Sequence, residues 1–113
     1  MTPTKTMDPM RGEVWDARLP QPVGFHPVVV LTTNALIPRL SAVTVAVITG
    51  SEGPPTTHVR LDRDVGLTEH DNSYVNATDL HSIAKPRLTR QRGRLDLGEL
   101  ERVEDAVRAY LDL

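Results

Sequence analysis

The chain contains no cysteine, and its only aromatic residues are Trp15, Phe25, Tyr74 and Tyr110. Without cysteine it forms neither disulfides nor a catalytic thiolate, and nothing in its composition indicates export. No apolar run approaches the roughly 18 residues that cross a membrane, and the N-terminus lacks the apolar core of a signal peptide. We therefore expect a cytoplasmic protein with no membrane partner, whose core is built from Val, Leu, Ile and Ala.

Phosphate-binding and metal-binding motifs are also missing. The sequence has neither a glycine-rich dinucleotide or nucleotide loop nor the HExxH pattern of zinc hydrolases. Its histidines are scattered without the spacing of metal ligands, at His26, His58, His70 and His81. We expect no metal and no cofactor.

The length of 113 residues predicts one domain with one core, and apolar and charged shares of 39% and 25% are typical of a soluble globular protein. We assign this domain to residues 11–113 and interpret residues 1–10 as a disordered leader. The net charge of −2 conceals a run from Lys85 to Arg94 with five basic residues and no acid. Such a run either binds phosphates or forms a solvated face.

Strand patterns fill most of the chain, and one helix pattern ends it. We expect a short helical turn over 35–37 and strands over residues 11–18, 28–33, 42–49, 57–62, 73–83 and 92–95. At the C-terminus, Asp96 and Glu99 form a variant of the capping box. An apolar stripe follows it, made of Leu97, Leu100, Val103, Val107, Tyr110 and Leu111. This order predicts a mainly β fold, a strongly bent antiparallel sheet or barrel with a C-terminal helix.

His26 lies between a Pro/Gly loop at 20–25 and the apolar run 28–31. A loop that must be exposed, followed by a buried strand, places this titratable imidazole at the rim of a rigid sheet. A group held in that way can act in catalysis. The plain alternative is a surface imidazole next to a proline.

Six short segments, in order, resemble the MazF/PemK (Kid) family of bacterial toxins. They are RGEVW at 11–15, FHPVVVL at 25–31, VAVIT at 45–49, THVRL at 57–61, DNSYVN at 71–76 with SI at 82–83, and RL at 87–88 with GRL at 93–95. Each segment alone is weakly specific, but six in register over residues 11–113 are fairly specific.

The resemblance implies an SH3-like barrel with a C-terminal helix, assembled as a homodimer. It also implies a metal-independent, sequence-specific endoribonuclease that cleaves single-stranded RNA. The expected partners are that RNA and a cognate antitoxin, whose C-terminal segment lies across the RNA site.

In the family, catalysis is attributed to an Arg before the Pro and to a Thr at a strand end, which correspond here to His26 and Thr49. An imidazole can replace the guanidinium in stabilising charge on phosphorus, and it can also carry a proton near neutral pH. Thr49 supplies a hydroxyl donor, and Ser51 can add a second. For Thr49 alone, a structural strand-end hydrogen bond is the plainer interpretation.

Four further residues are candidates for substrate binding. Gly24 and Phe25 belong to a loop that flanks the substrate, where Phe25 either stacks on a base or anchors the loop. Asp79 and His81 lie on one side of a strand that faces the RNA groove in the family. They are otherwise a solvent-facing polar pair.

Two other functions stay open. A fold relative, CcdB, poisons DNA gyrase through its last helix, so the fold alone does not define the activity. The replacement of Arg by His26 also allows a catalytically degenerate member that retains only antitoxin binding.

Overall fold

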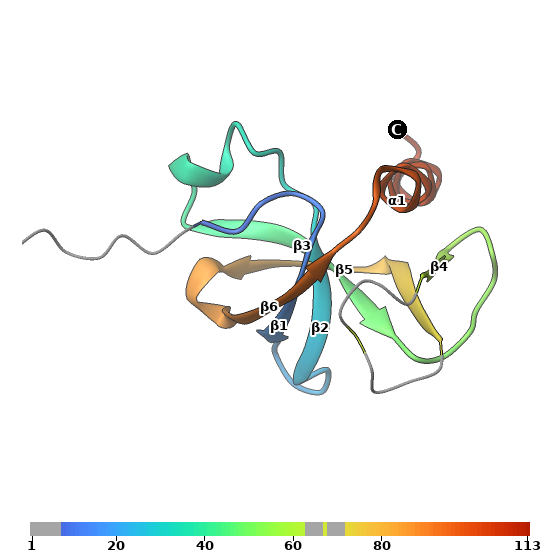
Figure 1. Cartoon of the computed structure of the whole chain (residues 1–113), viewed down its shortest axis with the longest axis horizontal. Coiled ribbons are helices and arrows are strands. Elements are labelled where there is room, and N and C mark those ends of the chain that lie inside the picture. The colour runs from blue at the N-terminus through green and yellow to red at the C-terminus, as the bar shows by residue number, and fades with distance from the viewer. Residues whose placement is uncertain (1–7, 63–66, 68–71) are drawn as a thin grey trace, which may run out of the picture.

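The structure, a computed structural model, describes residues 8–62, 67 and 72–113. Within them one antiparallel sheet is followed by a single α-helix, and the prediction of a mainly β fold is confirmed (Figure 1). The strands are β1 Glu13–Arg18, β2 Phe25–Val30, β3 Ala42–Thr49, β4 His58–Leu61, β5 Ser73–Ala84 and β6 Leu88–Arg94. Two 3-10 turns, Ile37–Arg39 and Lys85–Arg87, precede β3 and β6, and helix α1 spans Leu97–Leu111.

The sheet has the strand order β4-β5-β3-β2-β1-β6, so β3 and β2 are central and β4 and β6 form its edges. It is strongly bent but does not close into a complete barrel within the described residues. Helix α1 packs against β4 and β5, near the edge that β4 forms (Figure 1).

Strand β3 connects the two halves of the core. Val43, Val45 and Val47 belong to one buried cluster, whereas Ala46 and Ile48 belong to the other, which includes Val103 and Ala106 of α1. Alternation sends successive β-branched side chains to opposite faces of a strand. The predicted bounds of this strand, and its burial on both faces, are confirmed.

The N-terminus of α1 has the predicted capping box, in which Asp96 Oδ1 accepts from Glu99 N at 2.7 Å and Glu99 Oε1 accepts from Asp96 N at 2.9 Å. The predicted apolar stripe is correct at its centre but wrong at its ends. Val103 is buried, whereas Leu97 is 80% exposed and Tyr110 and Leu111 are about half exposed. Helix α1 packs mainly against β4 and β5, and the residues exposed at its two ends are not covered by them.

Two strands begin earlier than the sequence predicts. Strand β2 begins at Phe25 rather than at residue 28, so His26 lies inside a strand and pairs with Ala17. Strand β6 begins at Leu88 rather than at residue 92. Local propensity underestimates the length of both strands at their N-terminal ends. Pairing with β1 imposes the extended conformation on Pro27 in β2 and on a run of polar residues in β6.

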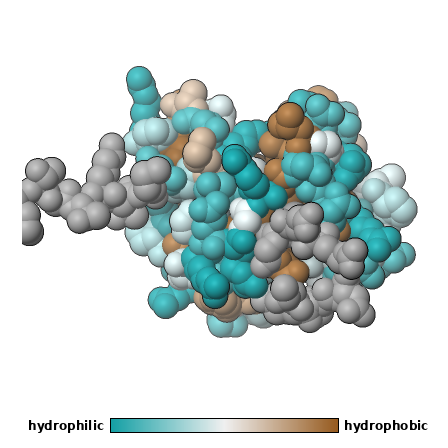
Figure 2. Space-filling view, in the orientation of Figure 1, coloured by the Kyte–Doolittle hydropathy of each residue, from teal (hydrophilic) through white to brown (hydrophobic). Residues whose placement is uncertain are grey.

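The face of the molecule drawn in Figure 2 is mostly hydrophilic. In the view of Figure 2, hydrophobic side chains form small separate patches among hydrophilic ones. No helix among the described residues combines the length and apolar character needed to span a membrane.

Candidate active site

A cavity of about 270 Å³ lies where β2 and β3 separate, and it contains both His26 and Thr49. Pocket volumes for drug-sized ligands are roughly 300–1,000 Å³, so this cavity lies just below the usual size of a small-molecule site. Its wall consists of Asp16, Phe25, His26, Pro27, Ile48, Thr49, Gly50, Leu67, Ser73 and Arg92.

The cavity opens because the β2–β3 ladder stops at the pair Val28–Val47. Continued in register, that ladder would put His26 opposite Thr49. Residues 25–27 instead pair only with β1, and Pro27 has no N–H to donate. The separation leaves His26 and Thr49 on the two sides of one opening.

The imidazole of His26 is held by the backbone of the neighbouring strand. Its Nδ1 lies 3.3 Å from the carbonyl oxygen of Ile48. Because a carbonyl only accepts, Nδ1 carries the proton in this contact, and Nε2 is the nitrogen left to take up or release a proton.

Thr49 ends β3, and its hydroxyl oxygen accepts a hydrogen bond from Ser51 N at 3.1 Å. An accepting hydroxyl still has its own hydrogen to donate. The exposed Ser51 therefore orients Thr49 through its backbone and does not line the cavity.

A buried ion pair forms another part of the wall. Arg92 Nη1 lies 3.1 Å from Asp16 Oδ1 and 3.4 Å from Oδ2. The two side chains are only 14% and 11% exposed, respectively. This pair adds a permanent cation and a carboxylate to the site.

Phe25 is 62% exposed at the cavity, so the interpretation that it anchors the loop is wrong. Gly24 closes the β1–β2 turn with φ +67°, a conformation that favours glycine, and its carbonyl accepts from Leu19 N at 2.9 Å. Gly24 shapes the turn beside the cavity without lining it.

Asp79 and His81 lie elsewhere. His81 Nε2 is 2.7 Å from Asp79 Oδ1, but His81 pairs with Val45, four residues along β3 from Thr49. At about 3.3 Å per residue this separation is roughly 13 Å. An irregularity in β5 between Asn76 and Leu80 breaks the alternation there. The pair forms a local cluster outside the cavity.

The loop after Thr49 is tied to β5. The hydroxyl of Tyr74 donates to Glu52 Oε2 at 3.1 Å, and Tyr74 pairs with Thr49 across the strands. Burial, and then the hydrogen bond to Glu52, raise the pKa of the Tyr74 phenol above 10.0. This contact steadies the far side of the opening.

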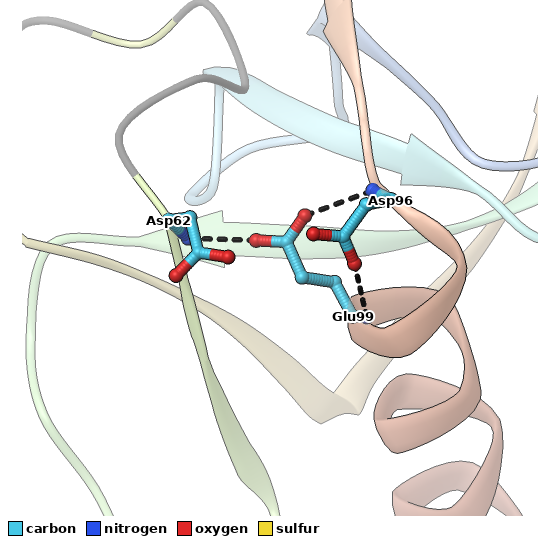
Figure 3. A group of neighbouring side chains, drawn as sticks. All are labelled: Asp62, Asp96 and Glu99. Atoms are coloured by element: carbon cyan, nitrogen blue, oxygen red, sulfur yellow. Dashed lines mark hydrogen bonds between the residues drawn. The ribbon is translucent and has the colours of Figure 1, made fainter.

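Three acids, Asp62, Asp96 and Glu99, come close enough to suggest a metal site (Figure 3). The buried Glu99 already uses both carboxylate oxygens, because Oε2 accepts from Asp62 N at 2.6 Å and Oε1 accepts from Asp96 N. Backbone N–H groups thus take the places that a cation would need. We interpret the trio as a clamp that joins the start of α1 to the end of β4.

A larger groove of about 1290 Å³ lies between β4 and α1 and contains His58. Its lining includes two arginines, Arg60 and Arg102, and two aspartates, Asp62 and Asp105, so it has no clear excess of positive charge for a phosphate. His58 is half-buried on a strand surface, and its Nδ1 lies 2.9 Å from Thr57 Oγ1. His70 lies outside the described residues.

Sequence reasoning missed Asp16 as a site residue and included Arg92 only as one member of the basic run. One signal was present, an acid between the apolar residues Trp15 and Ala17 of a predicted strand. Nothing in the sequence pairs it with a particular arginine.

A family model described as PemK-like, MazF-like toxin of type II toxin-antitoxin system matches residues 10–111. No curated protein sequence matches significantly. Among solved structures, the Mycobacterium tuberculosis toxin MazF-mt6 is 30% identical with a TM-score of 0.77, and the alignment covers 89% of this chain and 97% of that one.

Two more distant structures share the fold. MazF (Form-I) from Deinococcus radiodurans is 22% identical with a TM-score of 0.80, covering 96% of this chain and 100% of that one. An endoribonuclease from a mycobacterial species, in complex with its cognate antitoxin, is 24% identical with a TM-score of 0.79, covering 93% and 96%.

Proposed function

Since this chain belongs to the PemK-like, MazF-like toxins of type II toxin–antitoxin systems, we propose that it is a metal-independent endoribonuclease. Its substrate is single-stranded RNA, which it cleaves at specific sequences. The observation that carries the proposal is that one small cavity contains both His26 and Thr49, with an arginine beside them. Similarity to structures described as endoribonucleases supports it.

In the proposed reaction, the ribose 2′-oxygen attacks the adjacent phosphorus and the bond from phosphorus to the 5′-oxygen breaks. His26 Nε2 takes the 2′-hydroxyl proton, because Nδ1–H is held by Ile48 O. Thr49 donates a hydrogen bond to a phosphorane oxygen, and the leaving 5′-oxygen takes a proton from water. The products are a 2′,3′-cyclic phosphate and a 5′-hydroxyl.

We also propose the inhibition by an antitoxin, the cellular location and the oligomeric state that the resemblance implies. A cognate antitoxin inhibits the protein by laying its C-terminal segment across the cavity, as the existence of a related endoribonuclease–antitoxin complex supports. The active form is a cytoplasmic homodimer. The exposed Phe25 stacks on a base next to the scissile phosphate.

Incubation of a diverse single-stranded RNA pool with purified, antitoxin-free protein in EDTA tests the function. We expect cleavage at a limited set of sequences, with cyclic-phosphate and 5′-hydroxyl ends. Thr49→Val should lower the single-turnover rate about 10²–10³-fold, whereas Thr49→Ser should retain most of it. Intact RNA over a wide pH range contradicts the proposal, and trapped DNA gyrase cleavage complexes would favour the gyrase alternative.

A further inference from the structure

Arg92 lies at an irregularity of the β1–β6 ladder. Val14 pairs with Gly93 and Trp15 pairs with Gln91, so Arg92 is the extra residue between two paired positions. Such β-bulges redirect a side chain out of the regular alternation, and they are common beside active sites. Here the bulge accompanies a guanidinium side chain that is only 14% exposed and lines the cavity of His26 and Thr49.

Asp16 restrains that guanidinium. Both carboxylate oxygens lie within 3.4 Å of Nη1, and Asp16 itself lines the cavity. An arginine carries five N–H donors in a planar, rigid fork, so a carboxylate on Nη1 restrains the plane of that fork. A guanidinium oriented in advance loses little conformational entropy when it binds an anion.

The reaction chemistry requires such a cation. Charge accumulates on the phosphorane oxygens when the 2′-oxygen attacks, and fixed donors stabilise it. A histidine that accepts the 2′-hydroxyl proton must begin neutral, so His26 cannot also supply a permanent positive charge at the start of the step. The arginine that lines the cavity is Arg92 on β6, whereas position 26 holds a histidine.

We propose that Arg92 is a catalytic residue that donates hydrogen bonds to the non-bridging oxygens of the scissile phosphate, and that Asp16 is its positioning residue. The electrostatic role of an arginine is thus supplied from β6, while His26 on β2 transfers the proton. This assignment rests on the proposed ribonuclease function.

The test uses full-length protein and two readouts, single-turnover cleavage of an RNA that the wild type cuts and binding of its non-cleavable 2′-deoxy analogue. Arg92→Ala should slow cleavage about 10²–10³-fold. It should also reduce the slope of log affinity against log salt by about 0.7, the value for one phosphate contact on a single strand. Arg39→Ala, which removes an equal charge from the exposed turn before β3, should change neither.

Chemical rescue separates a catalytic role from a structural one. Added guanidinium ion should restore part of the cleavage rate of Arg92→Ala, whereas urea, which is similar in shape but uncharged, should not. Because Arg92→Ala leaves Asp16 buried without this partner, the double variant Asp16→Asn/Arg92→Gln is measured too; it should melt near the wild-type temperature and stay slow. Asp16→Asn alone should lower the rate less than Arg92→Ala.

The possible outcomes are distinct. If both Arg92 variants cleave RNA at the wild-type rate and bind the analogue with the wild-type salt slope, the assignment is overturned. The ribonuclease function is then left intact. If the cleavage rate falls only in proportion to the melting temperature and guanidinium does not restore it, the ion pair is purely structural. That result also overturns the catalytic assignment. If the wild type itself neither cleaves nor binds RNA, the proposed function fails and this assignment fails with it.

Discussion

The imidazole of His26 donates from Nδ1 to the carbonyl oxygen of Ile48 across the opening between β2 and β3, at 3.3 Å. The contact selects the tautomer whose Nε2 is basic, and it fixes the ring relative to Thr49, the next residue of β3. The rim of the sheet therefore holds a proton acceptor and a hydroxyl on adjacent strands.

We expect His26→Ala to lower the single-turnover cleavage rate about 10²–10⁴-fold, the usual contribution of a general base. His26→Arg should be slowed by a similar factor, because a guanidinium does not accept the proton. A wild-type cleavage rate in either variant would contradict the assignment of the base.

Phe25→Ala should weaken RNA binding without destabilising the fold. A base stacked on an aromatic ring contributes about 1–3 kcal/mol, so the Kd for the non-cleavable analogue should rise roughly 5- to 150-fold. Phe25→Tyr should bind like the wild type. Leu36→Ala, at an exposed apolar residue outside the cavity, serves as the control and should leave the Kd unchanged. Equal Kd values for Phe25→Ala and the wild type would exclude stacking.

Glu99→Ala should lower the free energy of unfolding by about 1–3 kcal/mol, because it removes the acceptor of two backbone N–H groups from a site that is 2% exposed. Glu99→Gln should cost less, since its single carbonyl oxygen can still accept one of them. Glu101→Ala, on the exposed side of α1, is the control in urea unfolding.

The same clamp predicts the response to divalent cations. Mg²⁺ or Ca²⁺ should not raise the melting temperature, since the oxygens of Glu99 already accept from backbone donors. A concentration-dependent rise that Glu99→Gln abolishes would instead identify the trio as a metal site.

Tyr74 should ionise above the ordinary tyrosine pKa of 10.0, because burial and the bond to Glu52 favour the neutral phenol. A pKa raised in the folded state contributes stability below pH 10.0, and that contribution disappears as the pH rises through the folded value. Wild-type stability should thus fall more steeply above pH 10.0 than that of Tyr74→Phe. The Tyr110→Phe variant leaves Tyr74 as the only tyrosine, so its tyrosinate absorbance reports the ionisation of Tyr74 alone. Ionisation of Tyr74 at the ordinary value of 10.0 in this variant would refute the prediction.

The elements that local physics dominates were predictable from the sequence. Asp96 and Glu99 predicted the start of α1 because both capping-box bonds lie within four consecutive residues. The β-branched run of 42–49 predicted β3, because nearly every one of its side chains is apolar or suited to a strand. Through the resemblance to MazF and PemK proteins, the sequence also singled out His26 and Thr49.

Only the tertiary structure could decide which distant residues meet. The β1–β6 pairing brings Asp16 to Arg92 across 76 positions of sequence, and a bulge turns that one arginine of a basic run into the cavity. The end of the β2–β3 ladder opens the cavity, whereas the register of β5 leaves His81 four positions from Thr49 along β3. Register and bulges depend on packing between strands, so no local pattern encodes them. The sequence by itself therefore determined the fold class, the helix cap and two residues of the candidate site; the tertiary structure decided the charge beside them.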